Sequence, residues 1–397
     1  MARKVRTVMY TVIVAVAALT LSSCSSGGAS SSSAPGVSKD SIKIGAFYPA
    51  TGNNSLYSNI SAGARAYFDM VNSKGGINGK TIDYVLRDDQ YDPSKTVSVA
   101  RRLVEDDKVF AIVSGVGSSG NAAVLDYMTK VGIPNVAPAG GGDVFAGKLR
   151  HNYFPLYPPY SSSAKILTAY ALDQLKAKSL SVFYENDDVG QPSVNAAKGV
   201  SQSAGKTLSA TVGYPTSEVD FSAYAQKLKE GGADAVLAFA GTPGLTGVEK
   251  ASKDIGYNPI WLAPAFAATN DFFKLGGSDG TYFDNYLVPV QTSDPSVELF
   301  KSQMKKVAPN VALGTLPEEG WVSAELFVDG VMLAEANGDL TWESFIKALE
   351  TFNNKDLSLG KGVTFTSQAH PGITKEGITQ AKGQSFVPVA TSITVPK

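Results

Sequence analysis

Three glycines have a spacing that is typical of anion-binding loops. The stretch Gly115-Val-Gly-Ser-Ser-Gly120 matches G-x-G-x-x-G, follows the apolar run 109–113 and precedes a helical pattern at 121–128. A strand, a glycine-rich turn and a helix N-terminus in this order can bind dinucleotide phosphates, or a smaller anion, through backbone N–H groups. Ser118, Ser119 and Asn121 add side-chain donors at the same place.

The surroundings of this motif disfavour a dinucleotide. An NAD site needs an acid at the end of the following strand to hold a ribose. Here that strand ends at Ala139 without an acid, and Asp143 lies beyond Gly140-Gly-Gly142. The motif also follows the third predicted strand and not the first. We therefore expect it to grip a smaller anion or polar ligand, although Ser118 or Ser119 capping the helix is the alternative.

Other reactive patterns are weak. The G-x-S-x-G spacing of a nucleophile elbow is absent, and His151 and His370 lack a readable Ser–Asp partner pattern. The adjacent acids Asp88 and Asp89 suit helix capping or loop bonds better than acid–base work. We predict no catalytic residue, no cofactor and no metal site, since one cysteine and two histidines argue against His/Cys ligation. A secreted hydrolase is the alternative from another class.

The N-terminus carries a targeting signal. Basic residues at 3–6 precede an apolar run at 8–20 that is too short to span a bilayer. The run ends in Leu21-Ser-Ser-Cys24, which resembles the lipobox of bacterial lipoproteins and implies cleavage before Cys24 and lipidation of its sulfur. We predict a signal peptide at 1–23, a flexible Ser/Gly-rich tether at 24–38, and an extracytoplasmic protein anchored by lipid to the bacterial cell membrane.

The remaining chain alternates strand and helix patterns, which indicates βαβ units. A net charge of −1 gives no reason to expect nucleic acid as a partner. We predict an α/β fold with two doubly wound parallel-sheet lobes. Strands are expected at 41–47, 81–88, 109–113, 134–137, 179–184, 208–214, 233–240, 259–263 and 386–395, and helices at 60–71, 93–106, 121–128, 163–177, 192–204, 221–230, 247–255, 297–307, 321–336 and 341–351.

Several motifs fall in the order seen in one family. Ile44-Gly-Ala-Phe-Tyr-Pro-Ala-Thr-Gly52, Val71-Asn-Ser-Lys-Gly-Gly-Ile-Asn-Gly-Lys80, Gly132-Ile-Pro-Asn-Val-Ala-Pro-Ala139 and Glu185-Asn-Asp-Asp-Val-Gly190 resemble the branched-chain amino acid type (type I) of periplasmic substrate-binding protein. The resemblance implies lobes at 41–156 plus 289–378 and at 157–288 plus 379–397, joined by a three-segment hinge. It also implies a monomer that closes on a small solute and delivers it to the permease of an ABC importer. A sensor that presents solute to a signalling partner is the alternative.

The same resemblance, with the glycines and aromatics near the expected cleft, gives the candidate ligand-binding residues. They are Tyr57, Ser118, Ser119, Gly120, Asn121, Ala139, Gly140, Gly141, Tyr157, Tyr184, Gly241, Thr242, Ala265 and Phe266.

Three candidates depart from the family pattern. Gly141 stands where the amino acid binders have a hydroxyl, Gly241 where they have an aromatic, and Ala265 where an acid holds the ligand's ammonium group. Asp187 or Asp188 could supply a substitute acid, although solvated loop charges are the simpler interpretation. A buried ammonium without a counter-charge is costly, so we expect a less charged or more apolar solute than a free amino acid.

Overall fold

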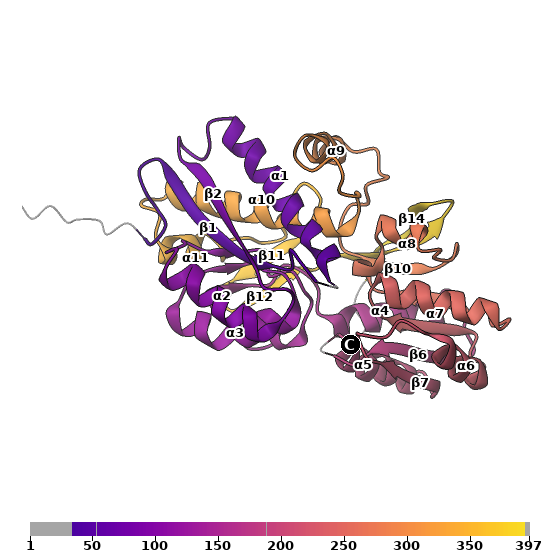
Figure 1. The fold of residues 1–397 in the computed structure, drawn as a ribbon. Helices are drawn as coiled ribbons and strands as arrows, with labels where there is room; N and C mark the ends of the chain where they lie inside the picture. The colour runs from indigo at the N-terminus through magenta and orange to yellow at the C-terminus, as the bar shows by residue number, and fades with distance from the viewer. Residues whose placement is uncertain (1–33, 53, 188, 394–397) are drawn as a thin grey trace, which may run out of the picture. The chain divides into compact units, whose positions relative to one another are not determined.

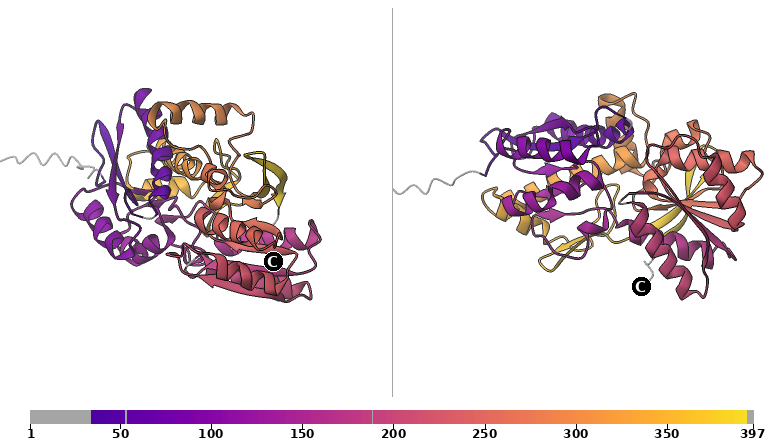
Figure 2. Two further views of the ribbon diagram at one scale, coloured as in Figure 1. Left: turned by 45° about the vertical axis from the view of Figure 1, so that its right-hand side comes forward. Right: turned by 60° about the horizontal axis from the view of Figure 1, so that its bottom comes forward.

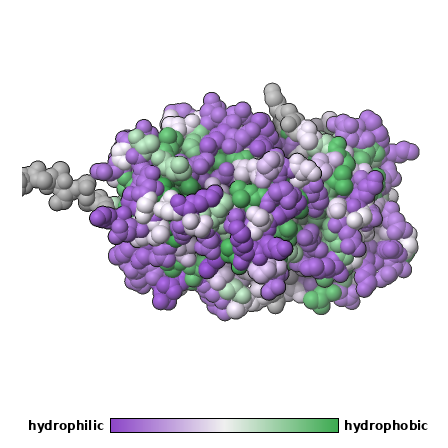
Figure 3. All heavy atoms as spheres, turned by 90° about the horizontal axis from the view of Figure 1, so that it is seen from above, coloured by the Kyte–Doolittle hydropathy of each residue, from purple (hydrophilic) through white to green (hydrophobic). Residues whose placement is uncertain are grey.

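The computed structural model describes residues 34–52, 54–187 and 189–393, and their arrangement is drawn in Figure 1. The predicted signal peptide, Cys24 and most of the predicted tether lie outside the described residues. Among those described, none of the helices is long and apolar enough to cross a bilayer. The face shown in Figure 3 is largely hydrophilic and carries separate apolar patches.

The first sheet is parallel throughout and has the strand order β2-β1-β3-β4-β5. Side chains alternate along β1, so Ile42 and Ile44 belong to the core cluster shared with α1, α9, α10 and α11, whereas Phe47 belongs to the cluster shared with α2 and α3. The elements are β1 (Ser41–Tyr48), α1 (Asn59–Ser73), β2 (Thr81–Asp88), α2 (Pro93–Glu105), β3 (Ile112–Val113), α3 (Ser118–Val131), β4 (Asn135–Val136), β5 (Tyr153–Phe154), α9 (Pro295–Val307), α10 (Thr315–Ala336) and α11 (Trp342–Leu349).

The second sheet has the order β14-β13-β10-β9-β8-β6-β7, with β13 and β14 antiparallel at one edge. Helices α4 and α5 cover one face and α6, α7 and α8 the other (Figure 2). The elements are α4 (Tyr160–Asp173), β6 (Leu180–Glu185), α5 (Gly190–Ser203), β7 (Leu208–Tyr214), α6 (Ser222–Gly231), β8 (Ala235–Phe239), α7 (Thr242–Asp254), β9 (Ile260–Ala263), α8 (Asn270–Lys274), β10 (Tyr282–Asn285), β13 (Glu376–Lys382) and β14 (Ser385–Ile393).

The chain passes between the two sheets three times. The connections are residues 155–159 after β5, residues 286–294 after β10, and residues 374–375 between β12 (Ala369–Ile373) and β13. Strand β12 pairs with β11 (Val363–Thr366) in a separate two-stranded sheet. The predicted doubly wound α/β fold is confirmed. The short strands β5 and β10 and the antiparallel β11, β12 and β13 were not predicted.

Two glycines let α1 and α10 approach backbone to backbone. A Cβ at Gly63 would lie 1.8 Å from the carbonyl oxygen of Pro317, and one at Gly320 would lie 1.7 Å from that of Ile60. Any side chain here must push the helices apart, because the obstacle is backbone and not a flexible side chain. This contact fixes the N-terminal ends of both helices, which carry residues of the cavity described below.

We predict that Gly63→Ala lowers the free energy of unfolding by about 1–3 kcal/mol or more. Gly199→Ala is the matched control, because this glycine lies in α5 and a Cβ there would meet no atom within 4 Å. Removing an unhindered helical glycine should raise stability by roughly 0.4–1 kcal/mol. Urea denaturation measures both changes, and equal effects of the two substitutions would contradict the tight helix contact.

Candidate ligand-binding site

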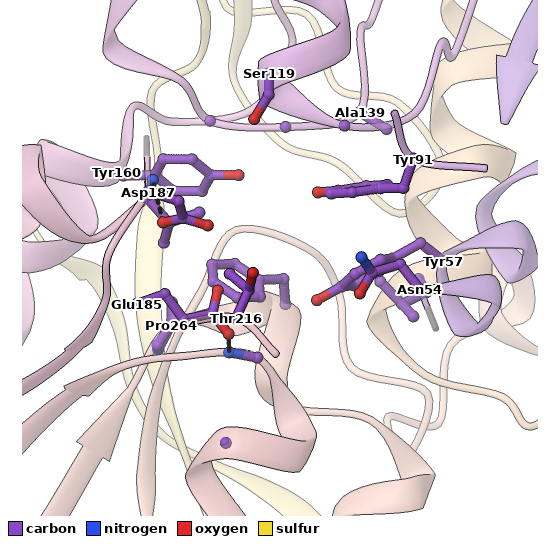
Figure 4. A pocket seen from close by; sticks show the side chains of 18 of the residues that line it. Asn54, Tyr57, Tyr91, Ser119, Ala139, Tyr160, Glu185, Asp187, Thr216 and Pro264 are labelled. Atoms are coloured by element: carbon purple, nitrogen blue, oxygen red, sulfur yellow. Dashed lines mark hydrogen bonds between the residues drawn. The ribbon is translucent and has the colours of Figure 1, made fainter. Parts of the chain in front are cut away.

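A cavity of about 550 Å³ lies at the carboxyl ends of strands from both sheets (Figure 4). Ligands of open α/β sheets bind at this end of the strands. Nine of the fourteen candidate residues line the cavity: Tyr57, Ser119, Ala139, Gly140, Gly141, Tyr157, Gly241, Ala265 and Phe266.

The start of α3 forms one wall. The helix begins at Ser118, three residues earlier than predicted, and its N-cap is Gly117 with φ of 99°. The expectation that Ser118 or Ser119 caps the helix is wrong, since the cap residue is a glycine without a side-chain bond. The first N–H groups of a helix have no carbonyl partner within the helix. The side chain of Ser119 points into the cavity beside them (Figure 4).

Ser118 and Asn121 do not line the cavity. Asn121 is fully buried, and its amide nitrogen donates to the carbonyl oxygens of Gly115 and Gly117 at 2.8 and 2.9 Å, so it holds the turn in shape. Ser118 Oγ lies 3.0 Å from the hydroxyl of Tyr160. Their role is to support the wall.

Gly120, Tyr184 and Thr242 are also outside the cavity lining. A Cβ at Gly120 would lie 2.8 Å from Thr96 Oγ1, so this glycine permits close packing of α3 on α2. The ring of Tyr184 lies beside Gly190 and Gly213 and not toward the cavity. Thr242 Oγ1 is used within the protein, where it bonds to the carbonyl oxygen of Ala267 at 3.3 Å.

The missing hydroxyl at Gly141 has a steric reason. A Cβ there would lie 2.5 Å from the carbonyl oxygen of Pro158 and 3.0 Å from the ring of Tyr160. Tyr160 thus takes the space that a side chain at position 141 would need, and its own hydroxyl reaches Ser118. Tyr160 is a cavity residue that the sequence did not reveal.

Gly241 has a similar explanation. A Cβ there would lie 2.9 Å from the hydroxyl of Tyr57, which comes from the segment before α1. Tyr57 stacks on Tyr91 with ring centroids 5.6 Å apart, and both rings point into the cavity (Figure 4). On the opposite side, Phe266 packs edge-on against Tyr160 at 5.7 Å. Aromatic rings from distant parts of the chain therefore surround the space.

Glu185 is the principal charged group that the sequence missed. It is the last residue of β6, and its Oε1 accepts hydrogen bonds from Tyr214 Oη at 2.6 Å and from the Gly241 N–H at 3.1 Å. Burial, together with the negative charge of Asp187, raises the pKa of Glu185 to about 7. Glu185 and Tyr214 each end a strand, which is the signal that could have identified them.

Asp187 also lines the cavity, and Asp188 lies outside the described residues. Asp187 Oδ1 accepts from the N–H groups of Val189 and Gly190 at 2.9 and 3.2 Å, so its carboxylate is fixed at the start of α5. β6 and the loop after it thus supply two acids at the cavity although position 265 has none. The expectation of a less charged or more apolar solute than a free amino acid stays a prediction.

Glu319 lies at another wall of the cavity. It is buried in α10, and the hydroxyl of Tyr286 donates to its Oε1 at 2.5 Å. Burial raises the pKa of Glu319 to about 7. The hydroxyl of Tyr157 donates to the backbone oxygen of the same residue at 2.6 Å. Tyr157 was among the candidate residues, whereas Tyr286 and Glu319 were not predicted, because they come from another connection and a distant helix.

The described lining residues include four acids and no lysine, arginine or histidine. The acids are Glu185, Asp187, Glu218 and Glu319. Among the residues that the structure describes, no cluster of three or more acidic, histidine or cysteine side chains is arranged to hold a metal ion. The electrostatics of the lining thus favour an organic cation, and the N-terminus of α3 offers a separate place for an acceptor or an anion.

Comparison with known proteins agrees with this architecture. The family model described as "Periplasmic binding protein" matches residues 41–385. The chain belongs to the periplasmic binding protein family. The resemblance of its motifs to the type I members of that family is confirmed.

Individual relatives of this periplasmic binding protein are distant. A Leu/Ile/Val-binding protein homolog 3 of Brucella melitensis biotype 1 is 25% identical over 303 residues, which are 75% of this chain and 80% of that protein. The fatty acid ABC transporter substrate-binding protein from Thermomonospora curvata has a TM-score of 0.83 at 22% identity, covering 92% of this chain and 97% of that one. A branched chain amino acid ABC transporter from Thermus thermophilus with bound valine has a TM-score of 0.82 at 19% identity, covering 89% and 97%.

These findings identify a binding protein for small ligands that acts outside the cytoplasm. The residues that bind the ligand are tested by none of them, so the candidate residues remain predictions.

The raised pKa of Glu185 makes stability depend on pH. The unfolded chain releases this proton near pH 4.5, whereas the folded protein keeps it to about pH 7. Ionisation of Glu185 therefore lowers the free energy of unfolding as pH rises from 4.5 to 7, and the full penalty remains above that range.

Glu185→Gln removes this penalty while its Oε1 can still accept from Tyr214 and Gly241. We expect the variant to gain on the order of 2 kcal/mol of stability over the parent at pH 8 and little near pH 4.5. Denaturant titrations at several pH values measure the difference. A gain that is the same at every pH would show that the Glu185 carboxyl is not desolvated.

Proposed function

We propose that this periplasmic binding protein captures a small organic solute by hinge closure and delivers it to the permease subunits of an ABC importer. The observation that carries the proposal is the cavity at the carboxyl ends of both sheets, lined from both by polar and aromatic groups. Three connecting segments permit one lobe to rotate against the other. The proposed lobes are 41–156 plus 289–378 and 157–288 plus 379–397, although β13, which pairs with β10 in the second sheet, already begins at Glu376.

We infer that the solute carries a cationic nitrogen, as an amino acid or a related amine does. Glu185 and Asp187 place two carboxyl groups at the cavity, and none of the described lining residues is basic. An ammonium group donates up to three hydrogen bonds and would stabilise the ionised form of both acids. The aromatic rings nearby supply apolar surface and cation–π contacts.

The opposite end of the solute would meet the α3 N-terminus. Backbone N–H groups and the Ser119 hydroxyl favour a carboxylate or an amide oxygen there. The solutes named for the structural relatives include valine and a fatty acid, which belong to different ligand classes. The ligand class of this protein is therefore inferred from the residues that line its own cavity. The described lining residues include four acids and no base, which disfavours a solute whose only polar group is a carboxylate, because like charges repel.

We propose a binding role and not an enzymatic one. Glu185 is held by Tyr214 and Gly241, and Glu319 by Tyr286, so both acids are fixed in place by neighbours. Neither His151 nor His370 lines the cavity. His151 instead pairs with Glu350 at 2.6 Å.

A thermal-shift screen of amino acids, amides and matched deaminated acids tests the ligand class. We expect amine-bearing solutes to stabilise the protein, since a ligand at a hundred times its dissociation constant adds about 2.7 kcal/mol. Glu185→Gln should weaken the best ligand roughly 10- to 100-fold through loss of a charged hydrogen bond. The control is Glu249→Gln, a buried acid outside the lining whose pKa is also raised to about 7 by burial.

The proposal fails if Glu185→Gln and Glu249→Gln weaken binding equally, or if deaminated acids bind best. Calorimetry on each variant provides the dissociation constants.

Lipid anchoring at Cys24 is a separate proposal. A thioether-linked diacylglyceryl group and an acylated amine would hold the protein stably at the membrane. We expect Cys24→Ser to move the protein from the membrane fraction to the soluble fraction of the producing bacterium. Ser23→Ala is the matched control and should remain in the membrane fraction. Continued sedimentation of the Cys24→Ser protein with membranes would contradict the anchor.

A further inference from the structure

A second cavity lies on the other side of the first connecting segment. It has a volume of about 460 Å³, close to that of the ligand cavity. Its walls are the loop 140–150 after β4, the segment 155–159 after β5, and residues 368–376 around β12 and the start of β13. Gly140, Gly141, Tyr157 and Pro158 line both cavities and separate them.

Most of its lining is apolar. Phe145 and Tyr153 are buried and their rings pack with centroids 5.2 Å apart. Pro155, Leu149 and Ile373 add further apolar surface. A space of this size and character fits an aromatic ring or a short alkyl chain.

Three residues of the lining carry a buried polar atom without a hydrogen-bond partner among the residues that the structure describes. The atoms are Tyr153 Oη, His370 Nε2 and Glu376 Oε2. Each of these atoms has almost no accessible surface, so it does not itself face the cavity. Burial and the nearby Asp284 raise the pKa of Glu376 to about 9, which keeps its carboxyl neutral at pH 7.

The remaining charges of the lining are positive. Half-exposed Arg150 and exposed Lys148 line the cavity, and neither takes part in an ion pair within the part of the chain that the structure describes. The guanidinium of Arg150 is close enough to Tyr153 to offset part of the rise in its pKa that burial causes. His370 Nδ1 lies 2.8 Å from the carbonyl oxygen of Tyr153, whereas its Nε2, 3.4 Å from Glu350 Oε1, makes no hydrogen bond.

We propose that this second cavity binds a small carboxylic acid with an apolar body, its carboxylate against Arg150. The apolar body would lie against Phe145, Leu149 and Pro155. The preference is opposite to that of the first cavity, whose described lining residues include acids and no base. This site is distinct from the one assigned under the proposed function, and its existence does not depend on that solute.

Calorimetry of the purified protein with benzoate and hexanoate tests the proposal, with benzamide and hexanamide as uncharged counterparts. We expect at least one acid to bind and its amide to bind at least tenfold more weakly. Arg150→Gln should weaken the acid at least tenfold. Arg102→Gln, an exposed arginine of α2 far along the chain from this loop, should leave binding unchanged.

A second variant distinguishes the effect of a lost positive charge from the effect of a lost cavity volume. Ser162 lies on α4 and lines only the second cavity, so Ser162→Phe should fill it and abolish binding while both cations remain. Circular dichroism verifies that each variant is folded. The proposal is overturned if neither acid binds, or if a bound acid keeps its affinity in both Arg150→Gln and Ser162→Phe.

Discussion

The site depends on a carboxyl group that the fold removes from water without giving it a cation. Glu185 ends β6, and its two donors are the hydroxyl of Tyr214 and the N–H of Gly241. Asp187 stands two residues further on and adds a second negative charge. Like charges near each other in a poorly solvated place destabilise the unliganded protein. A cationic solute would relieve that cost, so the same residues that lower stability would supply binding energy.

The elements around Glu185 explain why it is held so firmly. Strands β6, β7 and β8 are neighbours in the second sheet. Their carboxyl ends bring Glu185, Tyr214 and Gly241 close together. On the first sheet, the glycine contact between α1 and α10 fixes the helix ends near Tyr57 and Glu319. Glycines leave room for aromatic rings on both sides of the cavity. The missing side chain at Gly241 leaves space for Tyr57, and the one at Gly141 leaves space for Tyr160.

The fold was predictable from sequence because central parallel strands such as β6 and β8 are largely buried and form apolar runs between helical patterns. Strand β13 was missed, since it begins directly after a connecting segment, whereas the edge strand β14 was predicted at 386–395 although it carries proline and exposed valines. The predicted start of α3 was late because Ser118, Ser119 and Gly120 resemble a loop, and the cap proved to be Gly117.

The candidate site was predictable only where a residue follows its strand closely. Ser119, Ala139, Gly241 and Ala265, which were predicted from the family resemblance, line the cavity. Glu185 ends a strand as well but was treated only as part of a motif. Tyr160, Tyr286 and Glu319 reach the cavity through connections and a helix far away in sequence, which no local pattern records.

The most direct test is a carbon-13 NMR titration of the Glu185 carboxyl, without solute and with a saturating amine-bearing solute. The account predicts an apparent pKa near 7 in the unliganded protein and a marked fall when the solute is bound. An ordinary pKa in the unliganded protein, or a pKa that the solute leaves unchanged, would contradict the claim that a cationic solute stabilises the ionised Glu185 carboxyl.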